Sequence, residues 1–160
     1  MKTLLIKNIA SLVSCDEQDR VYENVDLYAE DGVICAIGAV PLIPRIPGVD
    51  GSNVIWAGDS FFEPERIGDQ LVIIGGGQVG CETALHLVEQ GHDVTVLEMK
   101  DDWAADAYFM HRNAMKIYID GSRIQIRTRT TAKAITEQGV LCAGPDGEVL
   151  VEADTILLAA

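Results

Sequence analysis

The first forty residues alternate between short apolar runs and polar breaks. Residues 3–14, 24–29 and 33–39 are rich in β-branched and apolar side chains, a composition typical of β-strands. The tripeptide Glu30-Asp31-Gly32 between the last two runs is typical of a hairpin turn. The pattern therefore predicts a small antiparallel sheet at the N-terminus.

Residues 40–51 interrupt this pattern with three prolines and two glycines. A helix cannot accommodate prolines at this spacing, so the segment is expected to be an extended connector with turns. It marks the best domain boundary in the chain. We predict a small N-terminal β segment over residues 1–39 and a larger domain over residues 40–160.

The larger domain begins with strand and helix patterns in strict alternation. Residues 71–74 are a continuous apolar run, as in a parallel strand that is buried on both faces. The periodicity then predicts helices over residues 78–90 and 104–119, closed by Gly91 and Gly121, and strands over residues 93–97 and 124–127. This order is half of a doubly wound α/β fold.

The remaining pattern consists of strands alone. Residues 131–135, 140–143 and 148–151 are short strand-like runs joined by glycine-containing turns, which predicts an antiparallel β-meander. Residues 155–158 are apolar and could re-enter the parallel sheet. The predicted fold class is α/β, with a parallel sheet that has helices on both faces, the meander, and the small N-terminal β-hairpin or sheet.

A glycine cluster follows the first buried strand of this domain. Residues 75–80 read Gly-Gly-Gly-Gln-Val-Gly, a G-x-G-x-x-G pattern between a predicted strand and a predicted helix. Gly75 permits a tight turn, Gly77 lets the backbone approach a pyrophosphate, and Gly80 lets helix and strand pack closely. The pattern predicts a Rossmann-like dinucleotide-binding domain, in which the helix amides stabilise the phosphate charge.

An acidic residue ends the next predicted strand. Glu98 lies 18 residues after Gly80, where its carboxylate can accept hydrogen bonds from the ribose hydroxyls of adenosine. A 2′-phosphate there would face like-charge repulsion on the order of 1 to 4 kcal/mol. We therefore predict NAD(H) over NADP(H), although Lys100, two positions further, could soften this preference. The simpler alternative is a glycine turn and a solvated acid.

Composition and charge exclude several classes of protein. A formal net charge of −13 disfavours binding to a phosphate backbone, and no basic cluster offsets it, so nucleic acid is not an expected partner. No run of 18 apolar residues and no secretory leader pattern occurs, which predicts a cytoplasmic protein that does not associate with membranes.

Neither cysteines nor histidines suggest a metal centre. The cysteines are widely separated and form no Cys-x-x-Cys pair: Cys15, Cys35, Cys81 and Cys142. The histidines form no His-x-His pair: His86, His92 and His111. We predict small buried thiols and ordinary surface or helix histidines, with no metal ligands and no catalytic residues.

Three segments together resemble one family. PLIPRIPGVDG, LVIIGGGQVGCETALHLVEQGHDVTVLEM and VEADTILLAA are similar to the pyridine nucleotide-disulfide oxidoreductase superfamily, in particular to NADH:flavin oxidoreductases of the 2,4-dienoyl-CoA reductase type. The resemblance implies an NAD(H)-binding domain of a flavoprotein, in which hydride passes from nicotinamide to FAD. It also implies that Glu82, the acid of GGGxxGxE, lies near the nicotinamide. On physical grounds alone a solvated helix glutamate is as good an interpretation.

The predicted cofactor-binding set combines the motif with this resemblance. Its members are Gly75, Gly76, Gly77, Gln78, Val79, Gly80, Glu82, Glu98, Met99 and Lys100. A second G-x-G-x-x-G for FAD is absent from the sequence, so we expect an incomplete enzyme that receives FAD only from another domain or chain. The partner would be a flavoprotein, or a second copy in a homodimer.

The N-terminal segment carries a different resemblance. MKTLLIKN and AEDGVICAIG are similar to the opening strands of amidohydrolases of the cytosine deaminase and chlorohydrolase type. This leaves two alternatives to the oxidoreductase interpretation. One is a truncated amidohydrolase-like fusion, and the other is a non-catalytic nucleotide-binding module.

Overall fold

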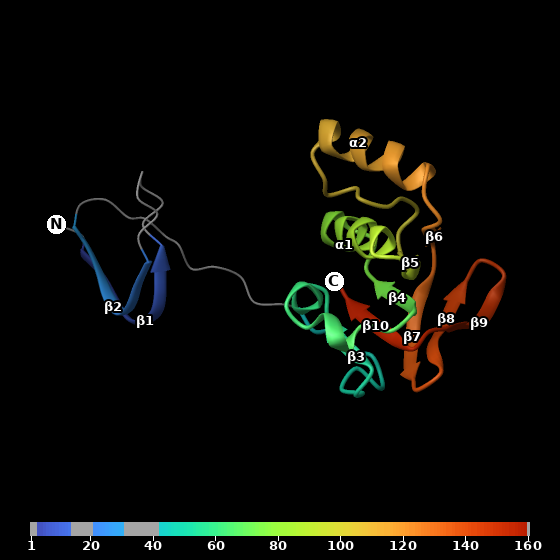
Figure 1. The fold of residues 1–160 in the computed structure, drawn as a ribbon, viewed down its shortest axis with the longest axis horizontal. Helices are drawn as coiled ribbons and strands as arrows, with labels where there is room; N and C mark the ends of the chain where they lie inside the picture. Colours follow the sequence, from blue (N-terminus) through green and yellow to red (C-terminus); the bar gives the residue numbers. More distant parts are fainter. Residues whose placement is uncertain (1–2, 14–20, 31–41, 160) are drawn as a thin grey trace. The chain divides into compact units, whose positions relative to one another are not determined.

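The computed structural model describes residues 3–13, 21–30 and 42–159 (Figure 1). Contacts within the chain divide it into two compact units, Met1–Val40 and Pro41–Ala160. No helix in these described ranges has the length and apolar character needed to cross a membrane.

The first unit contains one antiparallel strand pair. Strands β1 (Thr3–Val13) and β2 (Val21–Glu30) place Thr3 opposite Glu30, with a register irregularity between Ile6 and Ile9. The predicted small N-terminal hairpin is thus confirmed. The turn predicted at Glu30-Asp31-Gly32 and the strand predicted over residues 33–39 fall outside the described residues.

The second unit contains a parallel sheet and an antiparallel sheet. Its elements in chain order are β3 (Val54–Trp56), the short 3-10 helices η1 (Asp59–Phe61) and η2 (Pro64–Arg66), β4 (Gln70–Ile74), α1 (Gln78–Glu89), β5 (Asp93–Leu97), α2 (Phe109–Asp120), β6 (Gln125–Arg127), β7 (Thr131–Thr136), β8 (Gly139–Gly144), β9 (Gly147–Glu152) and β10 (Thr155–Leu158). The parallel sheet has the order β3-β10-β4-β5-β6, and the meander the order β7-β8-β9. As predicted, β10 re-enters the parallel sheet, where it pairs with β3 and β4.

Alternation along the parallel strands separates two cores. In β4, Leu71 and Ile73 pack with α1, whereas Val72 and Ile74 pack with the meander. The α/β class is confirmed, with one difference in detail. The prediction placed helices on both faces of the sheet, but the antiparallel sheet β7-β8-β9 covers the second face, as Figure 1 shows.

The prediction for the second helix was wrong at its start. A helix was predicted from residue 104, but α2 begins at Phe109. Ala104 has φ 45°, outside the helical region, and its N–H donates to the carbonyl of Gly76 at 2.6 Å. A tertiary contact therefore overrides a locally helix-favouring sequence.

Strand β3 was not predicted at all. It has three residues, and it forms by pairing with β10, a strand about a hundred residues further along the chain. Val54 and Ile55 are buried there, whereas Trp56 is partly exposed. So short an apolar run has no periodicity that distinguishes it from a loop.

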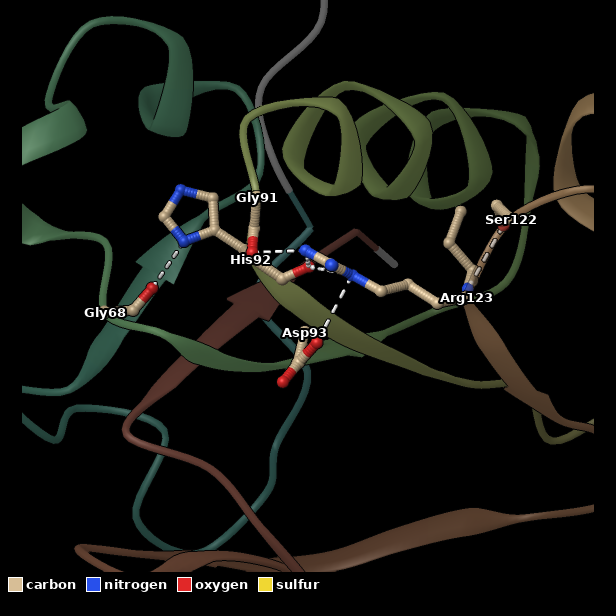
Figure 2. Close-up of polar contacts among 7 residues, drawn as sticks. Gly68, Gly91, His92, Asp93, Ser122 and Arg123 are labelled. Atoms are coloured by element: carbon tan, nitrogen blue, oxygen red, sulfur yellow. Dashed lines mark hydrogen bonds and ion pairs between the residues drawn. The ribbon is translucent and has the colours of Figure 1, made fainter.

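Helix α1 ends one residue before its predicted limit, and Arg123, which lies just before β6, holds the turn after the helix (Figure 2). Gly91 adopts φ 107°, the left-handed region typical of a residue that follows a helix. Arg123 donates to the carbonyls of Gly91 and His92 and pairs with Asp93 at 3.3 Å. His92 Nδ1 lies 2.7 Å from the carbonyl oxygen of Gly68. These contacts fix the edge of the sheet opposite the glycine turn, so both histidine and arginine have structural roles here.

Candidate functional site

The glycine turn joins the end of β4 to the start of α1. Gly75 has φ 112°, a conformation that a residue with a side chain rarely adopts, and its N–H donates to the carbonyl of Leu97 at 2.9 Å. Gly77 is the N-cap of α1 and has no side chain to cover the first helical amides. The N–H groups at the start of α1, which form the positive end of the helix dipole, are therefore not covered by a side chain of the N-cap residue.

The last glycine of the motif brings α1 against this turn. A Cβ atom built on Gly80 would lie 1.9 Å from the carbonyl oxygen of Gly75. On Gly76 it would lie 2.7 Å from Cβ of Glu98. The glycines at 76 and 80 are therefore required by close packing, which sets the distance between helix and strand.

Glu98 directly follows β5 and joins the two strand ends. Its side chain is buried, with 7% of the residue exposed. Oε2 accepts a hydrogen bond from the N–H of Gly76 at 2.9 Å, and Oε1 accepts one from the N–H of Lys100 at 2.8 Å. Charged hydrogen bonds of this kind stabilise a buried carboxylate. Glu98 thus holds the glycine turn beside the tip of β5.

A cavity of about 550 Å³ opens at this edge of the sheet. Six residues of the predicted cofactor-binding set line it: Gly75, Gly76, Gly77, Glu98, Met99 and Lys100. The other four do not: Gln78, Val79, Gly80 and Glu82. The volume is within the range of small-molecule sites in proteins.

Much of the lining was not anticipated from the sequence. The connector contributes Leu42, Pro44, Arg45 and Ile46 to the cavity wall, and the start of β7 contributes Thr131 and Ala132. The sequence marks residues 40–51 only as a proline-rich linker. Nothing in that pattern indicates that the linker folds back onto the glycine turn.

Glu82 lies outside the cavity, on the exposed side of α1. Its Oε1 accepts a hydrogen bond from Gln78 Nε2 at 3.1 Å and lies 2.6 Å from Nε2 of His111 on α2. Both side chains are almost half exposed. His111 is thus a carboxylate partner that sequence reasoning missed, because 29 residues separate the pair.

Asp106 was also missed. It lies in the irregular segment before α2, and its Oδ1 accepts a hydrogen bond from the N–H of Gln78 at 2.9 Å. A carboxylate therefore caps α1 from outside the helix. The sequence prediction placed Asp106 within a helix, where such a contact would not be expected.

The described cysteines are buried and free. Cys81 and Cys142 have no exposed surface. Burial raises the pKa of the Cys81 thiol to about 12, and the negative charges of Asp106 and Glu98 add to this effect. Burial also raises the pKa of Cys142. Cys15 and Cys35 lie outside the described residues.

These thiols should be unreactive in the native state. In a Cys15→Ser/Cys35→Ser variant, we expect a thiol reagent at pH 8 to label neither remaining cysteine until the protein unfolds. The thiolate is the reactive form, and a raised pKa suppresses it at this pH. Labelling followed by mass spectrometry checks this. Rapid labelling without denaturant would contradict the buried placement of both side chains.

Metal chemistry finds no support in the described residues. In residues 3–13, 21–30 and 42–159, no group of three or more histidine, cysteine or carboxylate side chains is placed to hold a metal ion. The polar lining of the cavity consists of backbone amides, the buried carboxylate of Glu98, two threonines, the exposed carboxylates of Asp102 and Asp106, and the exposed cations of Arg45 and Lys100. The amides and cations suit an organic anion, and carboxylates can accept hydrogen bonds from its hydroxyl groups.

A parallel sheet with a glycine turn at the tip of β4 and an acid at the tip of β5 defines a Rossmann-like α/β domain. The family comparison is specific. The model of the pyridine nucleotide-disulphide oxidoreductases matches residues 4–160, so the chain belongs to this family. The match begins within β1 and includes the N-terminal hairpin, the segment for which the sequence also suggested an amidohydrolase resemblance.

Relatives with curated names include oxidases, reductases and dihydrolipoyl dehydrogenases. The chain is 34% identical over 145 residues to an NADH oxidase of Thermoanaerobacter brockii, covering 86% of this chain and 22% of the relative. It is 32% identical over 140 residues to a cinnamate reductase of Clostridium sporogenes, covering 86% of this chain and 21% of the relative. The chain thus spans about a fifth of the length of these relatives.

A solved structure gives the same result. The chain superimposes on a 2-naphthoyl-CoA reductase, solved in complex with 2-naphthoyl-CoA, with a TM-score of 0.72 and 29% identity. The superposition covers 76% of this chain and 19% of that chain. The fold and the family are therefore supported by sequence and by structure.

Proposed function

We propose that residues 40–160 form the NAD(H)-binding domain of a flavin-dependent pyridine nucleotide oxidoreductase, which receives FAD from another domain or chain. The observation that carries this proposal is the hydrogen bond between Glu98 Oε2 and the N–H of Gly76 at 2.9 Å. It joins the glycine turn to the acid at the wall of a 550 Å³ cavity. In Rossmann-like sites the glycine turn contacts the pyrophosphate and the acid contacts the ribose, so the two have to lie next to each other.

The cavity fits the adenosine half of NADH. The amides at the start of α1 would hold the pyrophosphate, because Gly77 brings no side chain between backbone and ligand. The Glu98 carboxylate would accept hydrogen bonds from the ribose hydroxyls through its remaining lone pairs. The apolar side chains of Leu42, Ile46 and Met99 would contact adenine.

Glu98 also supports a preference for NADH over NADPH. A buried carboxylate next to the ribose repels a 2′-phosphate, an effect on the order of 1 to 4 kcal/mol. Arg45 and Lys100 line the same cavity and are exposed, so their charges are screened by solvent and oppose this repulsion only in part. We therefore infer that the site prefers NADH to NADPH but does not exclude NADPH.

Glu82 is proposed to lie at the nicotinamide end. Its Oε1 takes both contacts, from Gln78 and His111, whereas Oε2 accepts no hydrogen bond from the described residues. That oxygen is available to an amide donor such as the nicotinamide carboxamide. Bound NADH supplies a hydride for the flavin, and the residues of this chain bind and orient the cofactor.

Titration of the purified protein tests the proposal. We expect ADP-ribose and NADH to bind, NADPH to bind more weakly, and NADH to be oxidised only when a flavin site is present. Intrinsic fluorescence measures the affinities, and loss of nicotinamide fluorescence measures oxidation. Failure of both NADH and ADP-ribose to bind would refute the proposal, and binding without oxidation in the presence of free FAD and candidate flavoproteins would indicate a non-catalytic nucleotide-binding module.

A further inference from the structure

Residues 101–108, the later part of the segment between β5 and α2, contact the glycine turn. They are held there by two hydrogen bonds: the N–H of Ala104 donates to the carbonyl of Gly76 at 2.6 Å, and Asp106 Oδ1 accepts from the N–H of Gln78 at 2.9 Å. A Cβ built on Gly77 would lie 3.1 Å from Asp106 Oδ2. Both carboxylate oxygens of Asp106 therefore lie against the amide end of α1.

Asp106 occupies the position of an anionic ligand. In a glycine-turn site the first free amides of the helix donate to the pyrophosphate, and here the N–H of Gln78 already donates to a carboxylate. The ion pairs formed among the described residues do not include Asp106. Its charge is thus balanced by the helix amides and solvent, and a pyrophosphate in the same place would be repelled by it.

The backbone of the segment supports the same interpretation. Ala104 is fully buried but has φ 45°, a left-handed conformation that is unfavourable for a residue with a side chain. Asp106, by contrast, is exposed, as is its neighbour Ala105. The segment is anchored at Ala104 and at Ala107, which both belong to the core packing around Met115, whereas the exposed side chain of Asp106 can leave the helix amides without opening that core.

We propose that Asp106 is an internal competitor for the dinucleotide: its carboxylate holds the Gln78 amide when the site is empty and must leave when a pyrophosphate binds. This inference rests on the proposed NAD(H) site and deepens it. Asp106 then sets the affinity of the site for every ligand with a pyrophosphate. Ligands without phosphate do not compete with it.

The Asp106→Asn variant tests this with a ligand series. The amide oxygen still accepts from Gln78, but the negative charge is gone. We expect ADP-ribose and NADH to bind about tenfold more tightly than to the wild type, and adenosine to bind equally to both. Fluorescence or calorimetric titration measures the affinities, and unchanged adenosine binding reports that the adenosine part of the site is intact.

A control variant distinguishes the loss of the charge at Asp106 from a general change in the net charge of the protein. Asp120→Asn removes one negative charge from the exposed end of α2 and should leave all affinities unchanged. Equal or weaker binding of ADP-ribose to Asp106→Asn would overturn the inference while leaving the dinucleotide site in place. Loss of adenosine binding in Asp106→Asn would also overturn it, because Asp106 would then support the site. If neither wild type nor variant binds ADP-ribose, the proposed function itself fails.

Hydrogen exchange gives a measurement on the unmodified chain. When ADP-ribose binds, we expect the amides of residues 101–108 to exchange faster, because the contact through Asp106 is broken, and the amide of Gln78 to remain protected by the ligand. Slower exchange over residues 101–108 would mean that the segment closes over the ligand. That result would overturn the competition.

Discussion

Replacing Gly80 with alanine should destabilise the Pro41–Ala160 unit by about 3 kcal/mol and lower its affinity for NADH at least tenfold. The new Cβ would lie 1.9 Å from the carbonyl oxygen of Gly75 and 3.4 Å from Cβ of Ala159. The first contact is with backbone, so it cannot be relieved by rotating a side chain. Helix α1 must move away from the turn, which displaces the amides that we propose to hold the pyrophosphate.

Chemical denaturation measures the free energy of unfolding, and titration with ADP-ribose measures binding. Gly121→Ala is a suitable control, because Gly121 has a helical φ of −87° and a Cβ there would approach no atom closer than 3.4 Å. We expect that variant to stay within about 0.5 kcal/mol of wild type. If Gly80→Ala were equally harmless, α1 would not pack against the turn as described.

Elements fixed by local sequence were predicted well. Strands β5 and β10 begin and end at the predicted residues, and α1 ends one residue before its predicted limit. In α1, apolar periodicity coincides with a glycine just after the helix, and in β5 and β10 a short run of mostly buried apolar residues marks the strand. The information that sets their boundaries lies within about a dozen residues of sequence.

Elements whose structure depends on residues far away in the sequence were not predicted well. Residues 103–107 are rich in alanine and favour a helix locally, but the bond from Ala104 to Gly76 and the bond from Gln78 to Asp106 hold them in an irregular path. Strand β3 exists because β10 pairs with it. Single-sequence patterns carry no information on such pairings.

The candidate site shows the same division. The glycine turn and Glu98 could be named from the sequence, because strand, turn, helix and acid occur in one order within about 30 residues. The connector at Pro44 and Arg45, and the carboxylate of Asp106, meet that turn only through the tertiary fold. The motif therefore predicted the glycine turn and Glu98, but not the other residues that line the cavity around them.

The second large effect is expected for Glu98→Gln, which should lower the free energy of unfolding by about 2 kcal/mol. The carboxylate accepts from two backbone amides, those of Gly76 and Lys100. A glutamine side chain has one acceptor oxygen, so its NH₂ group must face one of the two amides, donor against donor. Glu98 is buried, so solvent cannot replace the lost acceptor.

The same substitution should change cofactor preference, because the repulsion of a 2′-phosphate depends on the charge of Glu98. We expect the ratio of NADH affinity to NADPH affinity to fall about tenfold, which corresponds to about 1.4 kcal/mol. Comparing a ratio removes the general loss of affinity that a loosened turn would cause in both ligands. Glu89→Gln, at the exposed end of α1, removes the same charge and should change neither stability nor the ratio. An unchanged ratio in Glu98→Gln would place the ribose away from this carboxylate, and the preference for NADH would then need another source.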